Sequence, residues 1–323
     1  MKRKLLILVP RFDGSAPVSV AQLNYRMIGR RNSRFMRLRF YDLIPYLIAR
    51  RSEKLILHTH TLNCDLIGYL LKIIYRHNIV WISTIHNSIE DTVKYRFKGR
   101  KLIGQIWYLI LNRTDTIIVL SEFYRRHYAK TLHVPSKILY NTVLREVWPE
   151  KKSLKAEFKL LCVGRLVRLK NFELVIKALS YLPNATLTIV GDGPEKESLQ
   201  RLALDLNVNK RVDFIGYTIN VDMYYKQCHA LVIPSFTEGF PLVLSEACSF
   251  GVPVAAADIE QLRDINLVSQ YFNNLDELSL VSSLEKLKNN YDYLAEWTWN
   301  NYMENYSYNK VKVEYNKIIE GLS

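Results

Sequence analysis

Two glutamates separated by seven residues stand in a segment whose pattern predicts a strand, a loop and a helix. The strand ends at Ile233, a loop with one glycine and two prolines follows, and the helix begins near Leu242. The first N–H groups of a helix have no partner within it and carry the positive end of its dipole, so they suit phosphate or sugar oxygens. The carboxylates of Glu238 and Glu246 are natural partners for hydroxyl groups. In a purely structural alternative, Glu238 only favours the helix start and Glu246 lies on a solvated face.

A second block of charged residues follows an earlier predicted strand. Gly164 ends that strand, and Arg165, Arg168 and Lys170 precede a helix. Arginine binds phosphate through two parallel hydrogen bonds, and lysine supplies a point charge. Such cations would neutralise a diphosphate leaving group where negative charge develops. An Arg–Lys pair before a helix is common on protein surfaces. This block therefore indicates a phosphate site only in combination with the glutamate pair.

Glycines and histidines stand at the ends of other predicted strands. Gly191 and Gly216 permit tight strand-to-helix turns, which a structural role also explains. In the first half, His86 ends one predicted strand, and His60 follows an earlier one that contains His58. A lone histidine at a strand end is more often structural than catalytic, but these positions would place His86 and His60 in a ligand cleft.

The glutamate pair and the Gly251–Val254 run after its helix resemble the hallmark of glycosyltransferase family 4, which is Glu-x7-Glu followed by a helix of small residues and Gly-Val-Pro-Val. By this resemblance, Glu246 holds the ribose hydroxyls of a donor nucleotide. Glu238 and the backbone at Phe240 and Pro241 hold the transferred sugar. The match is close over residues 155–258 and loose over the first 150.

The resemblance also assigns residues outside the glutamate pair. The family has an Arg and a Lys at the places of Arg165 and Lys170, which makes these two the expected phosphate clamp, and a functional His at the place of His86. The catalytic residues implied are Glu238, His86, Arg165 and Lys170. The donor-binding residues implied are Gly14, Gly164, Arg165, Lys170, Gly191, Gly216, Gly239, Phe240, Pro241, Leu242 and Glu246.

Three segments depart from the family pattern. Asn87 stands where the family commonly has an Asp after the histidine. Only Gly14 remains of a glycine-rich turn after the first strand, and Pro17 is foreign to that turn. The family often has a Gly-Gly turn and an acidic residue after the position of Ala257, and Ile259–Gln261 stands there instead.

The resemblance implies a retaining, nucleotide-sugar-dependent glycosyltransferase, with a UDP-sugar as the favoured donor. No Asp-x-Asp occurs in the chain, and metal-dependent sugar transferases of the other main fold use that pair for a divalent ion. We therefore expect neither a metal nor another cofactor, with cationic side chains in the ion's place. The reaction would pass through an oxocarbenium-like state, as in glycosidases.

Short β-branched or Leu-rich runs alternate with amphipathic stretches, which predicts βαβ units and parallel sheets. We expect an α/β fold of two Rossmann-like doubly wound domains facing across a cleft, the GT-B class, joined by a linker at Val143–Ala156. The expected domains are 1–150 on the acceptor side and 151–304 on the donor side, with a C-terminal helix at 305–323 whose candidate partner is the N-terminal domain. The expected strands are Lys4–Val9, Lys54–His58, Ile79–Ile85, Thr116–Leu120, Lys159–Val163, Ala185–Val190, Val212–Ile215, Ala230–Ile233 and Val252–Ala256. The expected helices are Val18–Arg30, Leu62–Arg76, Lys101–Asn112, Glu122–Thr131, Asn171–Leu182, Pro194–Asn207, Met223–Gln227, Leu242–Phe250 and Asn305–Gly321.

The net charge of +14 is concentrated in the first half, where residues 1–150 contain 26 Lys and Arg against 10 Asp and Glu. Such a field attracts polyanions: nucleic acid, an anionic membrane or a pyrophosphate-linked lipid. The segment Lys94–Lys101 mixes cations and aromatics and runs into the apolar stretch Leu102–Tyr108, which is typical of membrane interfaces. The alternatives are a solubilising surface and an ordinary core helix after a basic loop.

These features predict a cytoplasmic protein, peripheral on the inner face of the cytoplasmic membrane. The expected partners are a nucleotide-sugar donor and a glycan or polyprenyl-pyrophosphate-linked acceptor in surface-polysaccharide (lipopolysaccharide-type) synthesis. No recognised nucleic-acid-binding module occurs, so we expect no nucleic acid. A nucleotide-sugar 2-epimerase of the same architecture, a basic nucleic-acid-binding protein and a non-catalytic nucleotide-sugar sensor stay open as alternatives.

Overall fold

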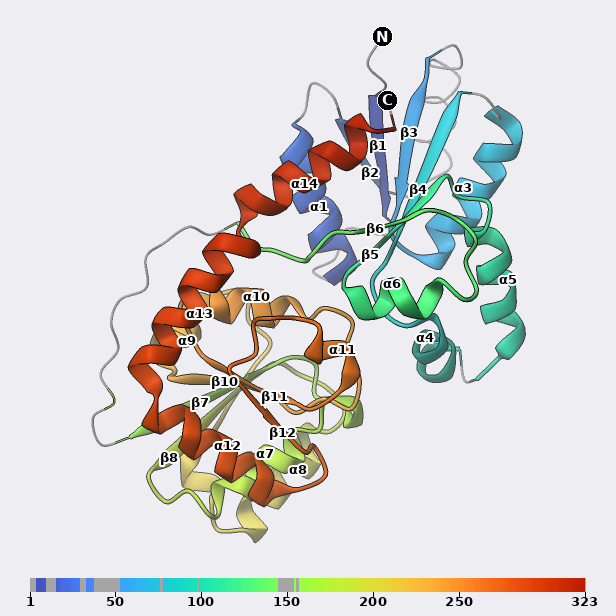
Figure 1. Cartoon of the computed structure of the whole chain (residues 1–323). Coiled ribbons are helices and arrows are strands. Elements are labelled where there is room, and N and C mark those ends of the chain that lie inside the picture. The colour runs from blue at the N-terminus through green and yellow to red at the C-terminus, as the bar shows by residue number, and fades with distance from the viewer. Residues whose placement is uncertain are drawn as a thin grey trace. The chain divides into compact units, whose positions relative to one another are not determined.

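A computed structural model describes residues 4–9, 16–29, 33–37, 53–75, 78–97, 99–144, 154 and 157–322 (Figure 1). The chain forms two compact units, one of residues 1–144 with 308–323 and the other of residues 145–307. Each unit contains a six-stranded sheet whose paired strands are all parallel. The predicted class, two doubly wound α/β domains, is confirmed.

The sheet of the first unit has the strand order β2-β1-β3-β4-β5-β6. Its central strands are continuous apolar runs because helices cover both faces of a parallel sheet; in β1, the five residues after Lys4 are all buried. The strands are β1 (Lys4–Val9), β2 (Ser33–Arg37), β3 (Leu55–Thr59), β4 (Ile79–Ile85), β5 (Thr116–Val119) and β6 (Ser136–Ile138).

Helices from both ends of the chain pack in this first unit. Val311, Tyr315 and Ile319 of the last helix are buried in one cluster with Leu5 and Ile7 of β1. Figure 1 shows this helix beside α1. The helices are α1 (Ala16–Ile28), α3 (Leu62–Tyr75), α4 (Ile89–Arg96), α5 (Lys101–Leu111), α6 (Glu122–Tyr128) and α14 (Tyr308–Glu320).

The sheet of the second unit has the order β12-β11-β10-β7-β8-β9. Because all neighbours are parallel, the carboxyl ends of these strands lie at one edge of the sheet, where open α/β sheets bind ligands. The strands are β7 (Phe158–Val163), β8 (Ala185–Val190), β9 (Val212–Gly216), β10 (Ala230–Ile233), β11 (Val254–Ala257) and β12 (Gln270–Phe272).

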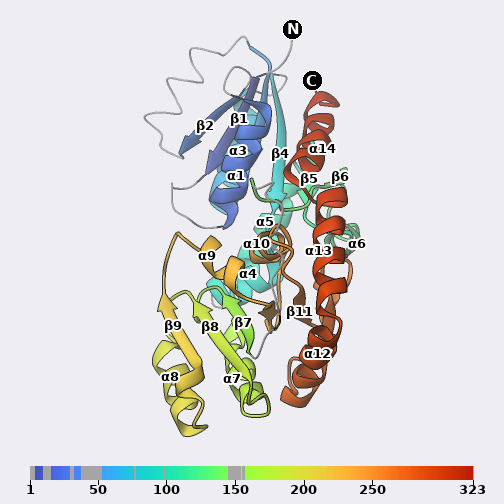
Figure 2. The same ribbon diagram turned by 90° about the vertical axis from the view of Figure 1, so that its left-hand side faces the viewer.

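The core of the second unit joins the sheet to helices packed against it. Val175 and Ile176 of α7, for example, are fully buried with Leu187 of β8, and α7 and α8 lie side by side (Figure 2). The helices are α7 (Phe172–Leu179), α8 (Lys196–Asp205), α9 (Asp222–Gln227), α10 (Leu242–Cys248), α11 (Glu260–Arg263), α12 (Glu277–Asn289) and α13 (Tyr291–Asn305), with 3-10 turns at Arg168–Lys170 and Asn209–Arg211. Within the described parts of both units, no helix combines the length and apolar character needed to cross a membrane.

Candidate active site

The predicted residues of the second half gather at the carboxyl edge of the second sheet. β7 lies between β8 and β10, so the loops that begin at Gly164, Gly191 and Pro234 are neighbours. Arg165 follows Gly164 directly and is exposed, and Glu238 lies on the loop that leaves β10. The topology therefore places the expected phosphate clamp and the expected sugar-binding loop on adjacent strands.

Backbone geometry favours glycine at two of the predicted positions. Gly164 and Gly191 have φ angles of 155° and 140°. Residues other than glycine rarely adopt this backbone conformation. A Cβ built on Gly191 would lie 1.9 Å from the carbonyl oxygen of Gly164. The N–H of Gly191 donates to the carbonyl of Gly216 across 2.9 Å. The strand-end turns can thus pack together only because Gly191 lacks a side chain.

Lys170 and Glu238 form an ion pair between two of these loops. The Lys170 Nζ lies 2.5 Å from the Glu238 Oε1, and the side chains are 25% and 9% exposed. The hydroxyl of Ser235 donates to the same Glu238 oxygen across 2.6 Å. Because the carboxylate is nearly buried and bonded twice, its orientation is fixed before any ligand arrives.

Asn171 holds the same two loops together. It has left-handed backbone angles of φ 51° and ψ 36°, directly after the 3-10 turn that carries Lys170. Its side-chain amide donates to the carbonyls of Pro234, at 3.3 Å, and Asn274, at 2.8 Å. The sequence pattern predicted Asn171 as the first residue of a helix, but its bridging role was missed, because nothing in the sequence shows which carbonyls the side chain reaches.

Glu246 lies on α10 and is bonded from a neighbouring helix. The Tyr225 hydroxyl of α9 donates to the Glu246 Oε2 across 2.8 Å. Tyr225 is fully buried, and its ring stacks on Phe250 with centroids 5.7 Å apart. Sequence reasoning did not single out Tyr225, since a tyrosine in a short helix carries no signal of its own.

The remaining residues of the glutamate loop lie where α10 begins. Pro241 precedes the first helical residue, Leu242. Gly239 and Pro241 are buried and Leu242 is half-buried. The Phe240 ring is 3% exposed and lies 6.2 Å from that of Tyr306, centroid to centroid. The loop is therefore packed into the second unit by its own apolar side chains.

Three histidines of the first unit form one group of neighbouring rings. His60 and His86 follow β3 and β4; the His60 Nδ1 is 2.9 Å from the His86 Nε2, and their rings stack with centroids 5.2 Å apart. His58 lies behind His60 at 4.2 Å between centroids. The His58 Nδ1 hydrogen-bonds the Tyr315 hydroxyl at 2.8 Å, and its Nε2 hydrogen-bonds the Thr84 hydroxyl at 2.7 Å. The predicted pair His60 and His86 is thus in direct contact.

Burial makes all three rings hard to protonate. Desolvation lowers the pKa of His58 and of His86 to about 3, with the neighbouring His86 adding to the effect on His58. Desolvation, His58 and His86 together lower the pKa of His60 well below its ordinary value. The group is therefore neutral near pH 7, so it can offer hydrogen bonds but no positive charge.

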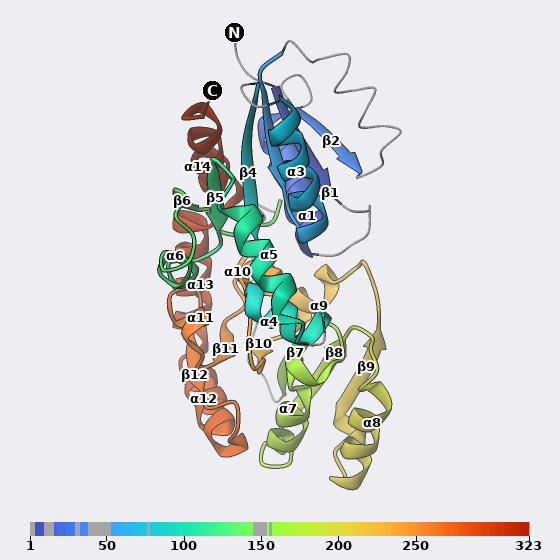
Figure 3. The same ribbon diagram turned by 90° about the vertical axis from the view of Figure 1, so that its right-hand side faces the viewer.

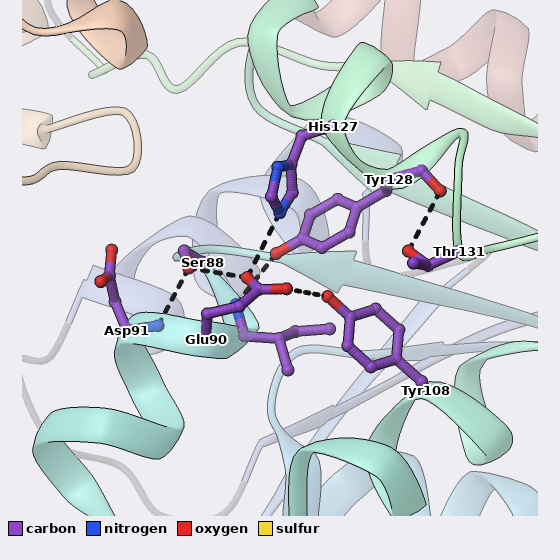
Figure 4. Close-up of polar contacts among 8 residues, drawn as sticks. Ser88, Glu90, Asp91, Tyr108, His127, Tyr128 and Thr131 are labelled. Atoms are coloured by element: carbon purple, nitrogen blue, oxygen red, sulfur yellow. Dashed lines mark hydrogen bonds and ion pairs between the residues drawn. The ribbon is translucent and has the colours of Figure 1, made fainter. Parts of the chain in front are cut away.

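A polar network not foreseen from the sequence anchors the chain just after His86 (Figure 4). The Ser88 hydroxyl accepts from the N–H of Asp91 and donates to Glu90, at 3.0 and 2.9 Å. Glu90 also accepts from the Tyr108 hydroxyl of α5, and its Oε2 lies 3.3 Å from the His127 Nε2 of α6. The Ser88-x-x-Asp91 spacing, which resembles a capping box, was the available signal for the start of α4.

Two further expectations concern Gly14 and metal ligands. Gly14, expected in the donor site, lies outside the described residues. Among the residues that are described, no three His, Cys, Asp or Glu side chains are grouped as ligands for a metal ion would be.

Comparison with known proteins assigns both halves of the chain. Residues 4–143 match the model of Glycosyltransferase Family 4, and residues 145–301 match that of Glycosyl transferases group 1. With the two parallel-sheet units, these matches define a glycosyltransferase of the GT-B class. The chain belongs to glycosyltransferase family 4.

Similar sequences and structures are themselves glycosyltransferases or share the fold. An uncharacterized glycosyltransferase of Haemophilus influenzae is 33% identical over 64% of this chain, and the match spans 61% of that protein. The Escherichia coli O-antigen biosynthesis glycosyltransferase WclY is 24% identical over 83% of this chain and 79% of its own length. Sucrose-phosphate synthase from Thermosynechococcus elongatus superposes with a TM-score of 0.82 at 18% identity over 99% of both chains. Anabaena HepE, solved in complex with UDP, superposes with a TM-score of 0.82 at 14% identity over 98% of this chain and 100% of its own.

Proposed function

We propose that the chain is a retaining glycosyltransferase that moves a sugar from a UDP-sugar to a hydroxyl of a glycan or lipid-linked acceptor in surface-polysaccharide synthesis. The observation that carries this proposal is the contact between Lys170 and Glu238 at the carboxyl edge of the second sheet. UDP in the HepE structure supports the choice of nucleotide. The O-antigen assignment of WclY supports the choice of pathway.

The two glutamates bind different parts of the donor. Glu246, held by Tyr225, binds the ribose hydroxyls. Glu238, held by Lys170 and Ser235, binds hydroxyls of the transferred sugar, together with the backbone at Phe240 and Pro241. Carboxylates that are already oriented lose little entropy when hydroxyl groups bind them.

The cations stabilise the negative charge of the leaving diphosphate. Arg165 is exposed beside Gly164 and forms the phosphate clamp with Lys170, so that positive charge faces the oxygens of the departing diphosphate as the glycosidic bond breaks. Because these side chains supply the charge, the reaction needs neither a metal ion nor another cofactor. His86, neutral through burial, contacts the donor sugar by hydrogen bonding. The leaving diphosphate takes the acceptor proton on the face from which it departs.

The acceptor is a glycan or a polyprenyl-pyrophosphate-linked sugar, and the protein works on the inner face of the cytoplasmic membrane. The basic excess of residues 1–150 suits an anionic surface and a pyrophosphate-linked lipid. The same charge is not assigned to nucleic acid, because no recognised binding module accompanies it.

Product analysis tests the proposal. The purified chain would be incubated with α-linked UDP-sugars and extracts of lipid-linked acceptors, and the anomeric configuration of the product read by NMR. We expect transfer with an α linkage, lost in Glu238→Ala and kept in Glu285→Ala, a control on the exposed side of α12. A β-linked product would refute retention. Free sugar or an epimer from donor alone would favour the epimerase, and nucleotide binding without turnover would favour the sensor.

A further inference from the structure

The first unit exposes aliphatic side chains on two packed helices, α3 and α5. Figure 3 shows both helices on one face of this unit. Within their described bounds, seven Leu and Ile side chains are between 44% and 70% exposed, and this set is called the aliphatic face: Leu66, Leu70, Ile73, Ile74, Leu102, Ile106 and Leu109. Isolated exposed apolar residues are ordinary on a protein surface, but a group of seven on two packed helices is typical of an interaction site.

Helical spacing shows that the face is a second apolar stripe, distinct from the core-facing one. On α5, Leu102, Ile106 and Leu109 stand at i, i+4 and i+7 and are exposed, whereas Trp107 and Ile110 are buried in the core. The same split holds on α3, where exposed positions alternate with buried ones such as Ile67 and Leu71. Each helix is therefore apolar on two sides, more than a helix needs in order to pack on its own sheet.

Charge around the face favours one kind of partner. The only carboxylate on the two helices, Asp65, is 1% exposed and accepts hydrogen bonds from Thr59, Ser83 and Trp107. At the start of α5, Arg100 and Lys101 are exposed. Lys72 of α3 is paired with Asp115 at 2.5 Å, and Glu90, which contacts α5, is bonded to Tyr108 and His127. An aliphatic surface with a cationic end and no exposed acid of its own matches an anionic lipid layer.

A second copy of the chain fits the face less well. Symmetric pairing would bring together two copies of a like-charged unit, since residues 1–150 contain 26 Lys and Arg against 10 Asp and Glu. The exposed set also contains only Leu and Ile, whereas the centres of protein interfaces are enriched in Trp, Tyr, Met and Arg.

We propose that the aliphatic face of α3 and α5 inserts shallowly into an anionic membrane, with Arg100 and Lys101 meeting the lipid headgroups. The proposal deepens the membrane location given above and does not depend on the identity of the donor. It adds α3, to which the sequence pattern assigned no membrane contact, to the basic segment and α5.

Vesicle flotation of the full chain tests this surface. The wild type should float with phosphatidylcholine vesicles that contain phosphatidylglycerol, and far less with phosphatidylcholine alone. The double variants Ile106→Gln/Leu109→Gln on α5 and Leu70→Gln/Ile74→Gln on α3 should each lower the partition coefficient by at least about tenfold, since each removes two large aliphatic side chains from the inserted layer. Leu204→Gln/Leu278→Gln, on exposed positions of the second unit, should bind vesicles like the wild type.

The outcomes separate this proposal from the enzymatic one. Absence of wild-type flotation, or equal flotation of the α3 and α5 variants, would overturn the membrane surface. A wild-type dimer that becomes monomeric in these variants would assign the face to a second copy instead. UDP-induced thermal stabilisation, measured on the same variants, should stay unchanged, so loss of flotation with intact stabilisation reports on the surface alone.

Discussion

The hydroxyl of Tyr225 donates a hydrogen bond to the carboxylate of Glu246 across 2.8 Å, from α9 to α10. The tyrosine is fully buried and stacked on Phe250, so its hydroxyl has one available direction. Glu246, which is only partly buried, gains a fixed orientation from a rigid neighbour. Tyr225 is therefore a positioning residue for the carboxylate that we assign to the ribose.

Tyr225→Phe should weaken nucleotide binding and leave the fold in place. Removing one hydrogen bond to a charged group costs about 1.5–3 kcal/mol, so the Kd for UDP should rise by roughly tenfold or more. Because ribose binding precedes chemistry, KM for the donor should rise more than kcat falls. Calorimetric titration gives the Kd, and Tyr224→Phe on the same helix is the matched control. An unchanged Kd in Tyr225→Phe would show that the contact is only structural.

Lys170→Ala should abolish most of the transferase activity. The change removes the cation that we propose for the leaving group and takes an ion-pair partner from the nearly buried Glu238. Loss of one such charge-stabilising group typically costs about 10²–10³ in kcat. Steady-state kinetics with Lys177→Ala as control, a lysine of α7 paired with Glu173 on the surface, measures the difference. Activity within a few-fold of wild type would remove Lys170 from the clamp.

Gly191→Ala should prevent stable folding of the second unit, because the added Cβ would meet the Gly164 carbonyl carbon and oxygen at 2.8 and 1.9 Å. We expect a loss of more than about 3 kcal/mol in the free energy of unfolding, the range of severe core defects. Gly29→Ala is the control, since Gly29 also has positive φ but nothing lies within 4 Å of the new carbon; it should cost about 1–2 kcal/mol. Equal Tm values for the two variants would contradict the packed turn.

The histidine group should make the protein lose stability as the pH falls. The folded-state pKa of His58 and of His86 is about 3 against the ordinary 6.5, so between these values the unfolded chain binds protons that the folded chain refuses, which favours unfolding. Asp65 acts in the opposite sense, because burial raises its pKa to about 6 and its contribution improves as the pH falls from 6 towards 3.8. With three rings against one carboxyl, the histidines should dominate.

Urea unfolding between pH 7 and pH 4.5 measures this effect. His58→Asn should flatten the decline in unfolding free energy relative to wild type, whereas His133→Asn, an exposed histidine, should not. Parallel curves for wild type and His58→Asn would contradict a neutral His58 in the folded state.

The strands that could be predicted are continuous apolar runs, whose side chains must be buried in any fold. β4, β8 and β10 begin and end where the sequence pattern places them, because apolar runs bounded by turn residues have one stable placement in a parallel sheet. The short strands β2, β6 and β12 were missed: Ser33–Arg37 and Ser136–Ile138 mix charged and apolar residues, and edge strands need only one buried face. The pattern also failed for α4 and for α11 to α13, whose apolar residues are sparse or mixed with many polar ones.

The candidate site was predictable in its residue types but not in its contacts. Spacing and strand ends pointed to Glu238, Glu246 and Lys170 in the second unit and, separately, to His86 in the first, since the parallel topology collects strand ends at one edge of each sheet. The pairing of Lys170 with Glu238 and of Tyr225 with Glu246 depends on side-chain directions across 68 and 21 residues, which no local pattern encodes.

The most direct test of the account is the thermal shift of the purified chain with UDP, GDP, ADP and CMP, in wild type and Glu246→Ala. A ligand that binds only the folded state at 100 times its Kd stabilises that state by about 2.7 kcal/mol, so UDP should raise the wild-type Tm clearly, the other nucleotides less, and none of them in Glu246→Ala. No shift with any nucleotide, or an equal UDP shift in the variant, would contradict a donor site built around Glu246.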